Sequence, residues 1–221
     1  MKNINWPDHL TNLIVVILGI TIAFYLEGWK ESKRSEKLEQ QYLTSLATDL
    51  QSDRYYLDTI MIINKSVGKS LEILSGATIG KPYPEDSLLI HLYATQFIPP
   101  FKPQKVTYET LKATGGLEVI KDFELRNRIV ELYEQYYRGG QEFDQAITDH
   151  TQNYIQPYFI KNLVFLGPNQ IDASFLHENE VRNMLFAEKN IFNLRSDFYK
   201  VLDVELNEIM EQVNQQIEPE S

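Results

Sequence analysis

The sequence predicts an all-α protein in which a single N-terminal transmembrane helix is continuous with a long helix of a helical-bundle domain. An uncharged apolar run from Leu10 to Leu26 leads into mixed charge with no proline or loop between them. Beyond this run, apolar residues recur at three- and four-residue steps, the period of a helix with one buried face. No strand-like alternation competes with that period. The chain therefore divides into a tail with an anchor, 1–29, and a helical-bundle domain, 30–221.

Composition argues against several classes of protein. The chain has 221 residues, so that about 190 follow the anchor, which suits one compact domain. The formal net charge is -10, which argues against nucleic acid as a partner, because binding to phosphates depends on clustered Lys and Arg. The chain contains no cysteine, which excludes disulfides, thiolate catalysis and Cys-ligated metal sites.

The two tryptophans of the chain indicate that the apolar run is a retained membrane anchor. A run of about 17 residues is at the short end of what crosses a hydrocarbon core of roughly 30 Å. Trp6 and Trp29 lie on opposite flanks of the run, about 35 Å apart along a helix, which is the spacing expected of interfacial aromatic residues. Phe24 and Tyr25 reinforce the second flank.

Two other interpretations of the run are weaker. A cleaved signal peptide needs a basic start and small residues before the cut, whereas here Lys2 is offset by Asp8, and Thr21 with Ala23 makes a poor cleavage site. A buried helix of a soluble protein usually shows more polar residues at helical intervals. Gly19 and Ala23 form a small-xxx-small pair that could let two anchors pack closely, although such pairs also arise by chance in apolar runs.

Charges around the anchor favour a cytoplasmic location for the bundle domain. Lys30, Lys33, Arg34 and Lys37 follow the anchor, whereas only Lys2 and the terminal amine precede it. Under the positive-inside rule this distribution places the bulk of the chain in the cytoplasm. Because the short tail is nearly neutral, the periplasm remains the alternative.

Proline and glycine divide the bundle domain into a series of predicted helices. The first continues from the anchor over about 30–75 and ends in "SGATIGKPYP", a stretch typical of helix ends and turns. Thr107 and Asp122 are the expected N-caps of two later helices. The shorter predicted helices span about 84–96, 108–114, 123–160, 178–189 and 191–217.

Two blocks of residues resemble a bacterial family known as domain of unknown function six-zero-nine-zero. The first block has Gly19-Ile20-Thr21-Ile22-Ala23, Trp29, Tyr42-Leu43, Leu46, Asp49 and Leu50. The second has Thr107-Tyr108-Glu109, Leu111, Thr114-Gly115, Leu117, Ile120, Asp122, Leu125-Arg126, Ile129 and Tyr133. The resemblance implies a single-span membrane protein with a helical domain in a Gram-negative bacterium, and it implies no activity. Relatives often carry a longer basic tail before the anchor, which implies a periplasmic domain and is lacking here.

The sequence shows no pattern that predicts catalysis, a metal or a cofactor. The four histidines His9, His91, His150 and His177 are scattered, and none lies four residues from another, as a helical metal pair requires. Candidate ligand or partner residues gather around two short turns: Tyr108, Glu109, Gly115, Gly116, Arg126 and Tyr133. The competing interpretation assigns these residues to caps, backbone breaks and core packing.

The expected function is therefore that of a non-enzymatic scaffold or interaction protein. We expect its partners to be the lipid bilayer and either a second copy of the chain or another membrane protein, with oligomerisation through the long membrane-proximal helix. The alternative is a ligand-sensing bundle tethered to the inner membrane, which holds a small molecule between helices near Tyr108 to Tyr137.

Overall fold

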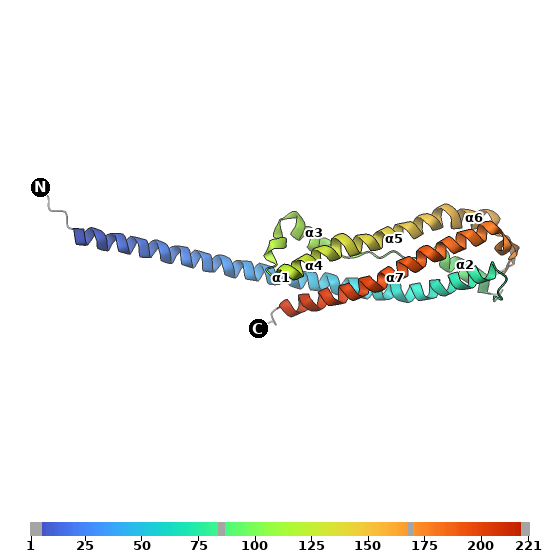
Figure 1. Cartoon of the computed structure of the whole chain (residues 1–221), viewed down its shortest axis with the longest axis horizontal. Helices are drawn as coiled ribbons and strands as arrows, with labels where there is room; N and C mark the ends of the chain where they lie inside the picture. Colours follow the sequence, from blue (N-terminus) through green and yellow to red (C-terminus); the bar gives the residue numbers. More distant parts are fainter. Residues whose placement is uncertain (1–5, 84–86, 168–169, 218–221) are drawn as a thin grey trace.

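The computed structural model describes residues 6–83, 87–167 and 170–217 and has the predicted all-α architecture (Figure 1). Its main feature is α1, Trp6–Ala77, a single helix of 72 residues. The N-terminal part of α1 projects alone, and its C-terminal part packs into the bundle. This helix is long and apolar enough to cross a membrane, with an 18-residue window of mean hydropathy 1.8 that lies entirely outside the packed core. The chain turns after α1 at Gly80, whose φ is 81°.

The bundle has four antiparallel positions, of which three are filled by long helices. The C-terminal part of α1, the helix formed by α4 to α6, and α7 run side by side (Figure 1). The fourth position is filled by α2, Leu88–Gln96, then an extended segment over 97–105, then α3, Val106–Ala113. Residues 84–86, where the sequence placed the start of the second helix, lie outside the described residues.

The third position of the bundle is one helix with two wider turns. It consists of α4 (Phe123–Glu131), η3 (Leu132–Tyr136), α5 (Tyr137–His150), η4 (Thr151–Ile155) and α6 (Gln156–Asn162), in which η3 and η4 are π-helical. Asp122 caps its start as expected, with Oδ1 accepting hydrogen bonds from the N–H groups of Glu124 and Leu125. Pro157 does not end the helix, and it lies directly after the wider π-helical turn η4.

Two local predictions were wrong. Thr107 is not an N-cap, since α3 begins at Val106. The sequence predicted a break between two helices near residue 190, whereas α7, Asn179–Gln216, is continuous because Phe192 and Arg195 carry its buried face through that point. The loop after α6 contains a small hairpin, in which β1, Phe165–Gly167, pairs with β2, Gln170–Ile171. The remaining turns are 3-10 helices, η2 (Gly116–Val119) and η5 (Ser174–His177).

Close helix packing explains the two glycines in the first turn of α5. A Cβ at Gly139 would lie 2.9 Å from Cζ of Phe198, and one at Gly140 would lie 3.4 Å from Cε1 of Tyr199. Both contacts are with α7. The glycines therefore let α5 and α7 approach closely, which outweighs their low helix propensity.

Candidate functional site

Tyr108 and Tyr133, two of the predicted site residues, meet in the core. Their rings stack with centroids 4.2 Å apart and an interplanar angle of 4°. The Tyr108 hydroxyl donates a hydrogen bond of 2.8 Å to Oε1 of Glu134. Both tyrosines are buried, so the space that the sequence assigned to a small molecule is filled by aromatic packing.

The other predicted site residues lie around this stack without converging on one point. Gly115 has a φ of 69°, the left-handed conformation that glycine adopts without strain, and it ends α3. Arg126 donates from Nη1 to the carbonyl of Ile120 at 3.3 Å and closes the following turn. Glu109 is exposed on α3, and Gly116 starts η2. As ligand or partner residues, all six remain predictions.

A buried polar network surrounds the extended segment between α2 and α3. An extended chain inside a helical bundle leaves backbone N–H and C=O groups without the hydrogen bonds of a helix. Asp144 accepts a hydrogen bond of 2.8 Å from the N–H of Phe101, and Asp53 accepts one of 2.6 Å from the N–H of Gln104. The buried carboxylates therefore satisfy the backbone of this segment.

Arg195, from α7, is the centre of this network and is completely buried. Its Nε donates to Oδ1 of Asp144 at 2.7 Å, its Nη1 to Oδ1 of Asn64 at 2.8 Å, and its Nη2 to the carbonyl of Pro99 at 2.6 Å. The guanidinium also lies 4.6 Å from the ring centroid of Tyr199. One cation thus connects α1, the extended segment, α5 and α7.

Two buried carboxyl groups have raised pKa values. Burial raises the pKa of Asp53 to about 7, even though Tyr137 donates a hydrogen bond of 2.7 Å to it. Burial likewise raises the pKa of Glu188, on α7, to about 7. The hydroxyl of Thr151 donates to Oε1 of Glu188 at 2.8 Å, and Nε2 of His150 lies 3.5 Å from Oε2. Desolvation disfavours the charged form in both cases.

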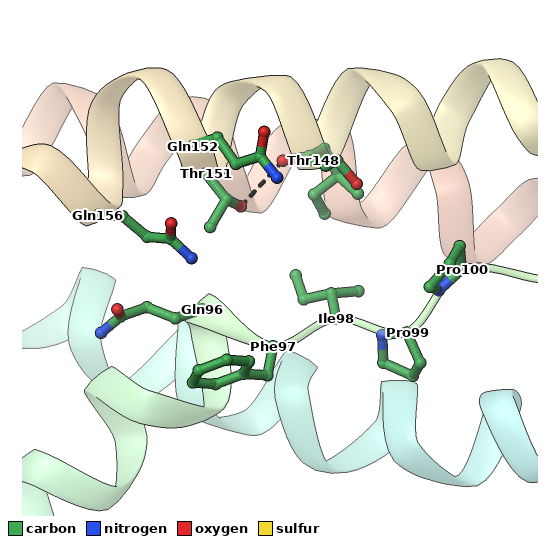
Figure 2. Close-up of a pocket in the computed structure, with 10 residues that line it drawn as sticks. Gln96, Phe97, Ile98, Pro99, Pro100, Thr148, Thr151, Gln152 and Gln156 are labelled. Carbon is green, nitrogen blue, oxygen red and sulfur yellow. Dashed lines mark hydrogen bonds between the residues drawn. The ribbon is translucent and has the colours of Figure 1, made fainter.

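A cleft of about 470 Å³ opens beside the π-helical turn η4 (Figure 2). Gln152 and Gln156 face it from the α4–α6 helix, and Gln96, Phe97 and Ile98 face it from the end of α2 and the extended segment. The remaining lining residues are Pro99, Pro100, Ile147, Thr148 and Thr151. Because all ten lining residues are uncharged, the cleft suits a neutral ligand that has an apolar surface and groups that form hydrogen bonds with glutamine side chains.

The outer face of α1 along the bundle is rich in small hydroxyl side chains, and the exposed charged residues Arg54, Asp58, Lys65 and Lys69 lie along its edge. The exposed uncharged positions of this face are Gln41, Thr44, Ser45, Thr48, Gln51, Ser52, Tyr55, Thr59, Ile62 and Ser66, which we call the Ser/Thr face. Hydroxyls of this face donate to the carbonyl four residues earlier, for example Thr48 to Thr44 at 3.0 Å and Thr59 to Tyr55 at 3.0 Å. These hydroxyls need no external partner, so the face presents small, weakly polar groups.

The family model for a family of unknown function, DUF6090, matches residues 12–164, which is more than half of the chain. The chain belongs to this family. No curated protein and no solved structure matches it. Within the residues that the structure describes, no group of three or more His, Cys, Asp or Glu side chains is arranged to hold a metal ion.

The match to DUF6090 covers the apolar run, the rest of α1 and the bundle as far as the end of α6. It leaves out α7, one of the three long helices of the bundle of this DUF6090 protein. Asp53 and Asp144 of the buried network lie within the matched range, whereas Arg195 and Glu188 lie beyond it. The side chains of Arg195 and Tyr199, which bond Asp144, therefore come from a helix outside the family match, whereas Tyr137, which bonds Asp53, lies within it.

Sequence reasoning missed the buried network, although one signal for it was present. Asp53 lies between Leu50 and Leu57 on the apolar stripe of α1, and Arg195 lies between Phe192 and Tyr199 on that of α7. A charged residue at a core position of a helical stripe predicts a buried ion pair or a buried backbone contact. Its partners cannot be predicted from one sequence, because they come from other helices.

Proposed function

We propose that this DUF6090 protein is a single-span membrane protein whose helical bundle is a non-catalytic scaffold or interaction domain. The observation that carries the proposal is the continuity of α1, which leads from an exposed apolar run directly into the bundle core. An apolar helix surface from Leu10 to Leu26 that no other part of the described chain covers is stable in lipid and unfavourable in water.

The proposed interaction is assembly with a second copy through the Ser/Thr face of α1. Small side chains with internally bonded hydroxyls allow close approach of another helix at little desolvation cost. Tyr55 and Ile62 supply apolar area on this face, since both side chains are more than 70% exposed.

Mass measurement of the full chain in mild detergent tests this assembly. We expect a dimer or larger oligomer for the natural sequence and a monomer for T48E/Y55E, which places negative charge on the Ser/Thr face. The matched control F186E/V204E adds the same charges at exposed positions of α7 and should leave the oligomer intact. A natural chain that is monomeric at all concentrations would contradict the proposal.

The proposed location is a bacterial inner membrane with the bundle in the cytoplasm. The basic residues that follow the apolar run support this orientation, and a periplasmic bundle is the alternative. Fusion of the C-terminus to alkaline phosphatase and to a fluorescent protein distinguishes the two. Fluorescence without phosphatase activity is expected, and the opposite pattern would place the bundle in the periplasm.

The cleft beside η4 favours a second candidate function, a ligand-sensing bundle. Its lining of three glutamines, two threonines and five apolar residues offers orientation and contact area to a neutral small molecule. Thermal-shift screening of the full chain against neutral amides and sugars tests this function. A ligand that stabilises the natural chain but not T148R, which fills the cleft, would support it, and the absence of any stabilising compound would count against it.

A further inference from the structure

The first turns of α1 beyond the apolar run carry a one-sided row of basic residues. Lys30, Lys33, Arg34 and Lys37 follow the spacing i, i+3, i+4, i+7 and are all exposed. At about 100° per residue, these four side chains occupy an arc of roughly 100° around the helix. We call this arc the basic stripe.

The acidic residues of the same segment lie outside the basic stripe. Glu27, Glu31, Glu36 and Glu39 balance the four basic charges, but at about 100° per residue they occupy the rest of the helix circumference. Glu36 and Glu39 are directed at the bundle, where Nζ of Lys121 lies 3.8 Å and 3.6 Å from their carboxylates. The segment is therefore neutral as a whole but strongly polarised across the helix.

The centre of the basic stripe faces away from the bundle, and Lys33 and Lys37 line a hollow that the bundle residue Lys121 also borders. Leu43, Leu46 and Leu50 mark the buried side of α1, and by the same helical period they lie roughly opposite the centre of the stripe. No described part of the chain covers this side of α1 between the apolar run and the bundle, where the helix projects alone (Figure 1). The stripe is thus open to any surface that α1 approaches.

Its position coincides with the headgroup layer of the proposed membrane. A bilayer adds about 5–7 Å of headgroup region to each side of its hydrocarbon core. Counted from Trp29, at about 1.5 Å per residue, Lys30, Lys33 and Arg34 fall within roughly 8 Å along the axis and Lys37 within about 12 Å. Long basic side chains reach back several ångströms toward the interface, so all four reach the lipid phosphates.

We propose that the basic stripe is a binding site for the headgroups of anionic phospholipids, which hold α1 to the bilayer on the side opposite the bundle. This proposal rests on the membrane anchoring proposed above. Phosphate oxygens accept charge-assisted hydrogen bonds from lysine and arginine. Lys33 is ion-paired with Glu36 at 2.8 Å, but both side chains are more than 40% exposed, and exposed pairs are weak enough to exchange for phosphate.

Fluorescence of Trp29 reports the lipids next to the stripe. Trp29 precedes Lys30 directly, its side chain is exposed, and Trp6 is the only other tryptophan. The full chain carrying Trp6→Phe is reconstituted into phosphatidylcholine bilayers that contain a fixed fraction of brominated phosphatidylglycerol or the same fraction of brominated phosphatidylcholine. Because bromine quenches only nearby tryptophan, the ratio of quenching gives the preference for the anionic lipid.

We expect phosphatidylglycerol to be preferred at Trp29 by about threefold to fivefold, since one basic residue near an anionic surface contributes roughly a fivefold preference. The preference should decrease at about 0.5 M salt. K30Q/K33Q/R34Q/K37Q should reduce it to about one. The matched control K65Q/K69Q/K161Q/K200Q removes four exposed basic residues of the bundle and should leave the preference unchanged.

Three outcomes overturn the proposal, and they are distinguishable. Absence of quenching in a fully brominated phosphatidylcholine bilayer rejects the membrane anchor, and the lipid site with it. Quenching that is equal for the two lipids leaves the anchor standing and rejects the site. A preference that persists in K30Q/K33Q/R34Q/K37Q shows that other residues select the lipid and also rejects the stripe as the site.

Discussion

At the residue scale, three of the buried ionisable residues lie where the backbone of a neighbouring segment is not helical. Asp53, Asp144 and Arg195 all bind backbone groups of the extended segment between α2 and α3. A bundle of four continuous helices would need no such charged side chains in its core, because the backbone groups of each helix bond one another. A buried charge is normally expensive, and here its cost is offset because the same side chain satisfies a buried peptide group.

Replacing Arg195 should be the most destabilising single change in this network. Arg195→Leu leaves Asp144 buried without its cation and removes the donors to Asn64 and Pro99, so we expect a loss of about 3–5 kcal/mol in the free energy of unfolding. Denaturant unfolding of the full chain in detergent, followed by circular dichroism, measures this loss. Lys200→Leu, at an exposed position of the same helix, is the control. A loss below about 1 kcal/mol would show that the network is not structural.

Asp53 should make the protein less stable as the pH rises. Burial raises the pKa of Asp53 from 3.8 to about 7, so the folded state keeps the proton to a higher pH than the unfolded state does. The contribution of this proton is present below about pH 4 and is lost as the pH rises through 7. Asp53→Asn mimics the protonated form and removes this dependence.

The pH effect is measured as the difference in unfolding free energy between Asp53→Asn and the natural chain. This difference should change in favour of the variant by about 2–4 kcal/mol between pH 4 and pH 8. Asp58→Asn, at an exposed position of α1, controls for the loss of one negative charge. A difference that is the same at both pH values would mean that Asp53 is ionised in the folded protein throughout.

At the element scale, periodicity predicted the long helices because each one buries a continuous apolar stripe. It predicted the start of α4 at Asp122, where the capping contact is local. It failed near residue 190, where the buried face of α7 continues through the charged residue Arg195. It also failed at β1 and β2, because these strands are too short to show an alternation of apolar and polar residues, and the side chains of β1 are mostly exposed. The extended segment and its partners depend on contacts between distant residues such as Pro99 and Arg195.

The cap at Asp122 should contribute measurably to the stability of α4. Asp122→Ala removes the acceptor of the N–H groups of Glu124 and Leu125, and loss of such a cap typically costs about 1 kcal/mol. Thermal or denaturant unfolding measures the loss. Glu124→Ala, two residues further along in the first turn of α4, keeps the cap and should cost clearly less. Equal costs for the two variants would show that the capping hydrogen bonds contribute little.

At the scale of the whole molecule, α1 joins the exposed apolar run to the bundle core in one element. The helix that presents the apolar run, the basic stripe and the Ser/Thr face also supplies one wall of the bundle core. Between the run and the bundle it has no neighbour in the described chain. A lone helix of this length in water is marginal by itself, so the lipid surface and a second copy are the contacts that we expect to stabilise this part of α1.

The continuity of α1 predicts a fixed distance between the anchor and the bundle. Because the chain contains no cysteine, cysteines introduced at Glu27 and Ile63 can be spin-labelled selectively. These positions are 36 residues and ten helical turns apart, so an unbroken helix separates their backbones by about 54 Å. Pulsed electron–electron double resonance on the full chain in nanodiscs, diluted with unlabelled protein, should give one narrow distribution of distances near that value. Ser35→Pro, which breaks the helix between the labels, should shorten and broaden it. A broad distribution in the natural background would instead mean that the bundle moves independently of its anchor.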